Sequence, residues 1–291
     1  MQSGQPSRTA LAAAAHRAVH QVLEKGRIFT DPLALRIVTQ DGDDAEELVR
    51  DAERNPHRRA MRLFIAARTR FAEDALTAAV AVGVTQLVVL GAGLDTYAYR
   101  GAMRDRLRIF EVDHPATQAW KRQRLADADI PLPHMLTFAP VDFERSTLDE
   151  GLAAAGFDPA QRSFFTWLGV VPYLTEEAAF ATLTFIASLP GGAEVVFDYS
   201  NPPGSLSPEM RAVHDARAQH VARIGEAWVS YFESDVLGAK LMSLGFTQVE
   251  DLGPPQIAAR YFPQRAGMAP AKGGHIVRAA LGPGSGSIRK V

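Results

Sequence analysis

The alternation of short apolar runs with longer helical stretches constrains the fold of this chain most strongly. Five runs rich in apolar and β-forming residues lie at residues 86–90, 108–113, 135–142, 163–171 and 193–199. Helical stretches separate several of these runs, at residues 115–128, 146–155 and 176–188. Such alternation is typical of βαβ units, which build a mostly parallel sheet. It predicts an α/β, doubly wound fold, in which residues 246–252 and 275–281 supply the closing strands.

The segments around this pattern predict a helical cap and a lid. The N-terminal part of the chain is rich in helix-forming sequence, and Asp31-Pro32 fits a helix start with Asp31 as its N-cap. Residues 201–237 interrupt the α/β rhythm with a turn cluster and a helical run that carries His214 and Trp228. An insertion after a strand end lies over the ligand crevice of such a fold, so we expect a lid there.

The length of the chain, 291 residues, is compatible with a single large core, and we predict one domain. Its predicted parts are a helical cap at 1–82, an α/β core at 83–200 and 238–281, a lid insertion at 201–237 and a flexible tail at 282–291. The tail is rich in Gly and Ser, a composition typical of mobile ends.

Composition excludes several classes of function. With 31 Lys and Arg against 33 Asp and Glu, the net charge of −2 argues against a dedicated nucleic-acid-binding protein. The chain has no Cys, which excludes disulfides, thiolate metal sites and cysteine nucleophiles. With thiolate ligands absent, we expect no metal.

Apolar stretches are too short for a membrane span, which needs about 18 residues. The Ala-rich run at 10–15 is interrupted by His16 and Arg17, so it does not resemble a signal peptide core. We therefore expect a cytoplasmic protein without a membrane partner, as a monomer or a homodimer.

The ends of the first two apolar runs carry the residues of a nucleoside site. Gly91-Ala-Gly93 follows the first run, and glycines there allow the backbone to approach a ligand closely. This is not the dinucleotide fingerprint, because its third glycine would fall at Thr96. Asp113 ends the second run, where a carboxylate can accept both hydroxyls of a ribose. We expect Glu111 to face away from this pocket.

The end of the third run adds Asp142 and Phe143. A carboxylate beside an aromatic ring can accept from the exocyclic amine of a base while the ring packs on that base. Together, the three strand ends describe an adenosine pocket that lies across consecutive strands.

Several motifs resemble the leucine carboxyl methyltransferase family, whose bacterial members include S-adenosylmethionine-dependent enzymes and some polyketide O-methyltransferases. The motifs are Ser7-Arg-Thr-Ala, Ile28-Phe-Thr-Asp-Pro-Leu-Ala, Arg68-Thr-Arg-Phe, Val89-Leu-Gly-Ala-Gly-Leu-Asp-Thr-Tyr-Ala-Tyr-Arg, Phe110-Glu-Val-Asp-His-Pro and Trp167-Leu-Gly-Val-Val-Pro-Tyr-Leu. The resemblance covers residues 7–281. It implies a class I methyltransferase fold, Rossmann-like, with seven strands of which the last is antiparallel.

The resemblance also implies roles for individual residues toward S-adenosyl-L-methionine, the methyl donor. Gly91, Ala92 and Gly93 would approach its methionine part, and the guanidinium of Arg68 would bind its carboxylate. Asp113 would hold the ribose. The other predicted donor contacts are Asp95, His114, Asp142, Phe143 and Leu168.

Leu168 is a departure from the family pattern, because many members have Glu at this position, five residues before the tyrosine that is Tyr173 here. This departure suggests that the acceptor is not the protein C-terminus for which the family is named.

The acceptor is predicted to be a small molecule or a short peptide that is methylated on a carboxylate or hydroxyl oxygen. A carboxylate is ionised at neutral pH and needs no general base, so it is the preferred acceptor. For a hydroxyl, His114 is the candidate base, ahead of the lid residues His214 and His220. Tyr173 is the second candidate catalytic residue. The predicted acceptor wall consists of Trp167, Tyr173, Tyr199 and Tyr261.

Two other functions share these features. An NAD-dependent oxidoreductase uses the same strand, glycine turn and acidic residue, but the missing third glycine counts against it. A donor-binding regulatory protein without catalysis is a second alternative, which the Leu168 departure leaves open. A serine hydrolase is disfavoured because the chain has no Gly-x-Ser-x-Gly motif.

Overall fold

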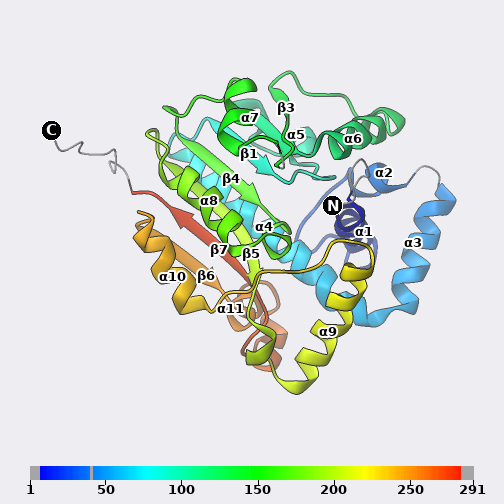
Figure 1. Ribbon diagram of the computed structural model, residues 1–291. Helices are drawn as coiled ribbons and strands as arrows, with labels where there is room; N and C mark the ends of the chain where they lie inside the picture. The colour runs from blue at the N-terminus through cyan, green and yellow to red at the C-terminus, as the bar shows by residue number, and fades with distance from the viewer. Residues whose placement is uncertain (1–6, 40–41, 144, 283–291) are drawn as a thin grey trace.

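The computed structural model describes residues 7–39, 42–143 and 145–282 (Figure 1). Its centre is one seven-stranded sheet with the strand order β3-β2-β1-β4-β5-β7-β6. The strands are β1 (Gln86–Leu90), β2 (Arg108–Asp113), β3 (Leu136–Pro140), β4 (Ser163–Trp167), β5 (Ala193–Ser200), β6 (Gln248–Leu252) and β7 (Gly274–Ala280). Only β7 runs antiparallel to its neighbours β5 and β6. The predicted doubly wound, mostly parallel seven-stranded sheet is confirmed, with its reversed last strand.

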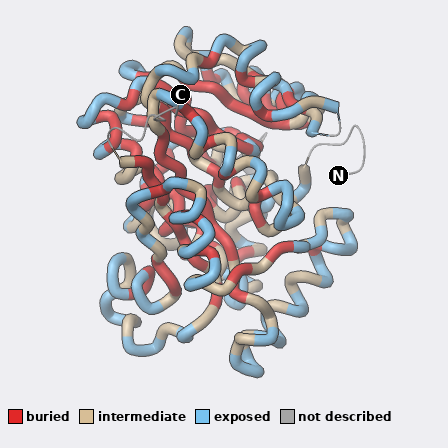
Figure 2. Tube along the Cα trace, turned by 60° about the vertical axis from the view of Figure 1, so that its left-hand side comes forward, coloured by how far each residue is buried: buried red, intermediate tan, exposed pale blue. Residues whose placement is uncertain are grey.

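Helices cover both faces of this sheet, and each face has its own hydrophobic core. On one face, β-strand residues pack with α7 (Leu148–Ala154), α8 (Glu176–Ala187) and α10 (Ser234–Ser243). On the other face they pack with α4 (Arg59–Ala81), α5 (Tyr97–Arg100), α6 (Pro115–Asp127) and α11 (Pro254–Tyr261). Figure 2 shows the buried strands enclosed by helices that are exposed on their outer sides. The order of the strands reverses between β1 and β4, and ligands of such folds bind at this switch point.

Three further helices precede α4, and the first of them lies against the turn after β1. They are α1 (Arg8–Leu23), α2 (Ala34–Val38) and α3 (Gly42–Arg54), followed by the short η1 (Pro56–Arg58). The N-cap of α1 is Ser7, whose hydroxyl accepts from the Ala10 amide at 3.1 Å. Within the predicted cap, α1 packs on α2, α3 and α4.

The predicted lid consists of η4 (Pro203–Ser205), α9 (Pro208–Arg223) and an irregular segment that leads to α10. This segment is bound to the start of α1 through Glu226. The carboxylate of Glu226 accepts from the Ser7 hydroxyl at 3.1 Å, from the Arg8 amide at 2.8 Å and from the Thr9 amide at 3.2 Å. The lid and the N-terminal helix therefore lie side by side over one edge of the sheet (Figure 1).

Some predicted boundaries are wrong in informative ways. The fourth strand ends at Trp167 rather than at residue 171, because Gly169 adopts a left-handed φ of +72° and η3 (Val171–Tyr173) follows. Trp228 lies beyond α9 rather than in a helix, since α9 ends at Arg223 and Gly225 turns the chain with a φ of +81°. The predicted tail after Gly282 lies outside the described residues.

Asp31 is not the N-cap of a helix. The α-helix begins three residues later, at Ala34, and Leu33 occupies its N-cap position. The Asp31 carboxylate is buried and its two oxygens have different partners: Oδ1 accepts from the Leu33 amide at 3.0 Å, and Oδ2 accepts from the Thr96 hydroxyl at 2.6 Å. The acidic residue therefore closes the turn that precedes the helix and does not cap the helix itself.

Candidate active site

The glycine turn after β1 is packed too closely for any side chain. Gly91 and Gly93 have left-handed φ values of +63° and +44°, which favour glycine. A Cβ atom on Gly91 would lie 2.4 Å from Val170 Cγ2, and one on Gly93 would lie 2.9 Å from the Ala10 Cβ. The turn is therefore held between the segment after β4 and helix α1.

Asp113 binds this turn directly. One carboxylate oxygen accepts from the Gly93 amide at 2.6 Å, and the other accepts from the His114 amide at 2.7 Å. Asp113 is 9% exposed, and its burial raises the pKa of the carboxyl above the usual value while both amides act to lower it. Each oxygen keeps a second lone pair, so the carboxylate can still accept from a ligand hydroxyl.

The expected orientation of Glu111 needs a correction. Residues two apart on a strand point to the same face, so Glu111 and Asp113 share a face of β2. They differ in depth: the Glu111 carboxylate is fully buried and lies 2.7 Å from the Lys121 ammonium. Burial raises the pKa of Glu111 to about 7 in spite of Lys121. Glu111 is therefore part of the interior, and only Asp113 reaches the edge of the sheet.

His114 has a structural role in this arrangement. It is the N-cap of α6, and its ring Nδ1 accepts from the Ala116 amide at 3.2 Å. In the neutral ring with Nδ1 as acceptor, the proton is on Nε2. Neither nitrogen then offers a free lone pair, so this geometry gives no support to the predicted role of His114 as general base.

The loop after β3 lies next to Asp113, since Pro140 pairs with Asp113 in the strand register. Phe143 is 62% exposed on this loop, and Asp142 lies 3.5 Å from Arg145. The structure thus brings the predicted adenosine residues to one edge of the sheet, with an exposed aromatic ring at its rim.

Arg68 reaches the same edge from α4. Its Nη1 donates to the Asp198 carboxylate at 2.7 Å, and the other oxygen of Asp198 accepts from the Gly169 amide at 2.6 Å. The guanidinium covers Gly169, where a Cβ would lie 2.7 Å from Nη2. The Nε of Arg68 is buried and has no hydrogen-bond partner among the described residues. A buried guanidinium with a spare N–H fits an anionic ligand group.

The residues predicted to line the methyl-acceptor site do not all lie at the edge of the sheet that Arg68 reaches. Trp167 and Tyr199 are each 2% exposed and belong to the core on the α8 face, so they do not lie with Arg68. Tyr261 packs against the α4 face, and its hydroxyl is buried without a partner among the described residues. Leu168 also packs against the α4 face.

Tyr173 does lie near the glycine turn. Its hydroxyl meets the side chains of Trp228 and Thr9, which come from the lid segment and from α1. Burial raises the pKa of Tyr173, so its hydroxyl remains a hydrogen-bond donor at neutral pH. The lid histidine His214 is engaged elsewhere, by Asp215 at 3.0 Å and by the Tyr231 hydroxyl at 3.1 Å.

A buried ionic network that the sequence reasoning missed fixes the loop after the glycine turn. The hydroxyl of Thr96, at the position of the absent third glycine, donates to Asp31 and accepts from Arg100 Nε at 2.9 Å. Arg100 also pairs with Glu73 at 2.5 Å. Arg17 from α1 donates to the Leu94 carbonyl at 2.6 Å. Thr96 is therefore required by this network, in place of the close helix packing that a third glycine permits.

The sequence profile of the leucine carboxyl methyltransferases matches residues 10–187. The chain belongs to this family. It is 34% identical over 201 residues to YktD of Bacillus subtilis, provisionally named an S-adenosyl-L-methionine-dependent methyltransferase, and the match covers 68% of this chain and 66% of that protein. The chain thus spans just under two thirds of that relative's length. A similarly named protein of Frankia alni is 35% identical over 233 residues, or 79% of each chain.

A weaker likeness extends to solved structures. An O-methyltransferase family protein from Burkholderia thailandensis superimposes with a TM-score of 0.47 at 12% identity, over 94% of this chain and 73% of that one. Family membership confirms the resemblance on which the donor site was predicted.

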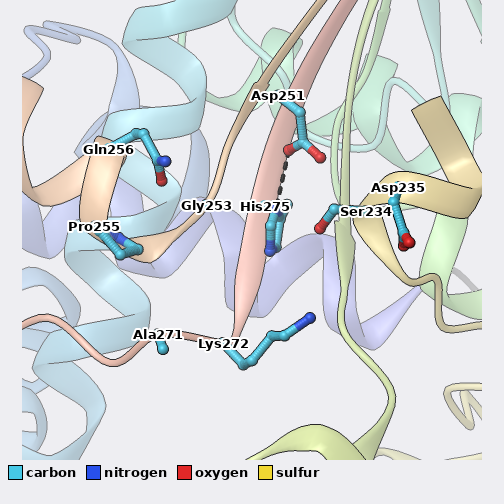
Figure 3. A pocket seen from close by; sticks show the side chains of 9 residues that line it. All are labelled: Ser234, Asp235, Asp251, Gly253, Pro255, Gln256, Ala271, Lys272 and His275. Atoms are coloured by element: carbon cyan, nitrogen blue, oxygen red, sulfur yellow. Dashed lines mark hydrogen bonds and ion pairs between the residues drawn. The ribbon is translucent and has the colours of Figure 1, made fainter.

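One cavity of the protein lies away from the glycine turn. It has a volume of about 370 Å³ and opens where β6 ends and β7 begins (Figure 3). Its lining includes Asp251, Lys272 and His275. The Tyr199 hydroxyl donates to the Asp251 carboxylate at 2.7 Å. In the strand order this cavity is on the opposite side of β5 from β1.

Within the described ranges, no helix has the length and apolar character that a membrane crossing requires. The same residues contain no group of three or more His, Asp or Glu side chains that could hold a metal ion.

Proposed function

We propose that the protein transfers the methyl group of S-adenosyl-L-methionine to an oxygen of a small-molecule or short-peptide acceptor, with a carboxylate preferred over a hydroxyl. The coarser part of this statement follows from family membership: the chain is an S-adenosyl-L-methionine-dependent methyltransferase. The acceptor and the oxygen chemistry are the proposal. A cytoplasmic location, a monomeric or homodimeric state and the absence of nucleic-acid and membrane partners stay predictions.

The observation that carries the donor site is the bond between Asp113 and the glycine turn. It places a carboxylate with spare lone pairs at the switch point of the sheet, beside the glycine turn, of which Gly91 is exposed. Arg68 adds a buried N–H without a partner among the described residues, suited to the carboxylate of the donor. These residues fit the donor, and we propose that they hold its ribose, methionine part and carboxylate respectively.

The chain's own contribution to the reaction is positioning and the exclusion of water. When bound, the donor supplies an activated methyl group, whose bond to sulfur breaks with its electron pair left on sulfur while an acceptor lone pair forms the new C–O bond. Tyr173 offers a protonated hydroxyl under the lid, and Glu226 holds the lid segment against α1. Both can keep the acceptor aligned and shielded.

The preference for a carboxylate rests on two of the candidate histidine bases. His114 uses its Nδ1 as a helix cap, and His214 is engaged by Asp215 and Tyr231. A phenol or alcohol acceptor is helped by a general base, whereas a carboxylate is not.

The chemistry of the product tests this proposal. The protein is incubated with methyl-labelled donor and a panel of carboxylates, phenols and alcohols. A methyl ester releases labelled methanol in mild base, whereas a methyl ether survives. We expect base-labile product, and a base-stable product formed at a good rate would refute the carboxylate preference.

Cofactor choice is tested by calorimetry. We expect S-adenosylhomocysteine to bind at micromolar concentration and NAD not to bind, because the Thr96 network fills the position of the third glycine. NAD binding without a response to S-adenosylhomocysteine would favour the oxidoreductase instead. Binding of S-adenosylhomocysteine without turnover of any acceptor would favour the regulatory alternative.

A further inference from the structure

The carboxylate of Asp198 lies next to the position at which this chain departs from its family pattern. Trp167 pairs with Phe197 in the register of the parallel strands β4 and β5. The residues that follow them, Leu168 and Asp198, are therefore neighbours across the two strands. Side chains alternate between the faces of a sheet, and both of these residues face α4: Leu168 packs on that side, and Asp198 binds Arg68. The chain thus has a carboxylate beside Leu168, on the neighbouring strand.

Asp198 connects Arg68 to the wall of the glycine turn. One of its oxygens accepts from Arg68 Nη1 at 2.7 Å, and the other accepts from the Gly169 amide at 2.6 Å. The next residue along the chain, Val170, bounds the turn, because a Cβ on Gly91 would lie 2.4 Å from Val170 Cγ2. A continuous series of contacts therefore places the ion pair beside the turn that the donor is proposed to occupy.

The ion pair is buried and has no net charge of its own. The side chains of Arg68 and Asp198 are 10% and 6% exposed, and neither has a second ionic partner in the part of the chain that the structure describes. A ligand with only a carboxylate would add an uncompensated negative charge beside this pair, which is costly in a buried site. A ligand that carries both a carboxylate and an ammonium group leaves the site neutral. The pair therefore favours a zwitterion.

Both members of the pair can still bind a ligand. The Nε of Arg68 is buried and has no hydrogen-bond partner among the described residues. Each oxygen of Asp198 accepts one of the two bonds described above and keeps a second lone pair. A free guanidinium N–H suits a carboxylate, and spare carboxylate lone pairs suit the N–H donors of an ammonium group. The two charged groups of an amino acid thus have separate partners here.

We propose that Asp198 and Arg68 form a subsite for the zwitterionic amino-acid end of the methyl donor, in which Asp198 binds the α-ammonium group and Arg68 the α-carboxylate. This inference rests on the proposed function and adds Asp198 to it as a specificity-determining residue. The subsite selects an adenosine thioether that carries both charges over one that carries only the acid, because the acid alone leaves Asp198 without its partner.

Three thioethers that differ only in the amino-acid end test the subsite without any need for turnover. S-adenosylhomocysteine carries both charged groups, its deaminated analogue is a butanoate thioether of adenosine, and methylthioadenosine carries neither group. Each is titrated calorimetrically into the full-length protein. We expect S-adenosylhomocysteine to bind at least about tenfold more tightly than the deaminated analogue.

Matched substitutions on β5 assign this preference to one carboxylate. Asp198→Asn should lower the affinity for S-adenosylhomocysteine at least about tenfold and abolish its advantage over the deaminated analogue. Glu194→Gln is the control, since Glu194 is 5% exposed and pairs with Arg278 at 2.6 Å, but lies at the opposite end of the strand. This variant should keep the full preference. Methylthioadenosine should bind both variants like the unaltered protein.

Two results would overturn the subsite while leaving the proposed function in place. One is equal affinity of the unaltered protein for S-adenosylhomocysteine and its deaminated analogue, a measurement that stands even where Asp198→Asn does not fold. The other is an equal loss of affinity for both ligands in Asp198→Asn, since Asp198 would then only orient Arg68. Failure of all three thioethers to bind the unaltered protein would instead overturn the proposed function, and the subsite with it.

Discussion

The buried polar groups at the carboxyl edge of the sheet differ between its two halves in whether they have hydrogen-bond partners. In the first half, at β1, β2 and β4, Arg68 keeps a buried N–H that no described residue accepts. In the second half, at β5, β6 and β7, the groups bind one another. His275 pairs with Asp251 at 2.8 Å and with Asn201 at 2.9 Å, and Tyr199 also donates to Asp251. The cavity of Figure 3 opens on this second half.

This difference shows that the unpaired N–H of Arg68 is a better guide to the proposed donor site than the cavity beside Asp251 is. Buried polar groups in folded proteins are normally paired, so a surplus indicates where a ligand would complete the structure. In the second half, Tyr199, Asn201, Asp251 and His275 already bind one another and join three strands and the residue after β5. We therefore assign ligand binding to the first half and stability to the second.

The largest effect is expected in the second half. Asp251→Ala removes the charged partner of the His275 ring and of the Tyr199 hydroxyl, which keep Asn201 and Ser234 as their remaining partners. At roughly 1.5–3 kcal/mol for a hydrogen bond to a charged group, the free energy of unfolding should fall by about 2–4 kcal/mol. Chemical denaturation measures this loss. Affinity for S-adenosylhomocysteine, measured on the folded variant, should not change, and a large loss of affinity would break the comparison.

The next effect belongs to the first half and should appear in binding. Asp113→Ala removes the carboxylate that is predicted to accept from the ribose hydroxyls. The affinity for S-adenosylhomocysteine should fall by about ten- to hundredfold, or roughly 1.5–3 kcal/mol of binding free energy. Asp105→Ala is a suitable control, since the Asp105 side chain is 75% exposed. Glu111→Ala is unsuitable, because it would leave Lys121 buried without its carboxylate. Equal affinities of Asp113→Ala and the control would remove Asp113 from the site.

A smaller effect concerns pH. The pKa of His16 is lowered to about 4 in the folded protein from an ordinary value of 6.5. Between these two values the unfolded chain binds a proton that the folded protein does not, so stability falls as the pH falls from about 6.5 to about 4. His16→Gln should reduce the loss of unfolding free energy over this pH range by about 1–2 kcal/mol, allowing for the partial exposure of His16. Unfolding curves at several pH values check this, and identical slopes would contradict it.

The smallest effect is expected at the contact between lid and α1. Glu226→Gln keeps one acceptor oxygen but removes the negative charge at the start of α1, where a charge contributes roughly 0.3–1 kcal/mol. Hydrogen exchange in residues 224–233 should become faster, while the global unfolding free energy changes by about 1 kcal/mol or less. Unchanged exchange would show that Glu226 does not hold the lid.

Much of the fold, and the contact between Asp113 and the glycine turn at the proposed donor site, could be predicted from the sequence because the signals are local. The runs that became β1 and β2 end at their predicted residues, and the glycine turn meets Asp113 because parallel strands share a carboxyl edge. The prediction for β4 was too long because its apolar run continues past Gly169, whose left-handed backbone ends the strand.

The remaining site residues could not be predicted because their partners are distant in the sequence. His16 and Arg17 were visible only as an interruption of an Ala-rich run. The basic run that contains Arg62 and Arg68 has the composition of a solvated face. Burial of these two residues depends on Glu24 and Asp198, which lie 38 and 130 positions away.

A crystal structure of the protein with S-adenosylhomocysteine tests the central claim most directly. The account predicts that the ribose hydroxyls lie within hydrogen-bond distance of Asp113 and that the ligand carboxylate accepts from Arg68. It also predicts that the cavity beside Asp251 and His275 holds no ligand. Density for S-adenosylhomocysteine in that cavity, with Asp113 bonded only to Gly93 and His114, would contradict the account.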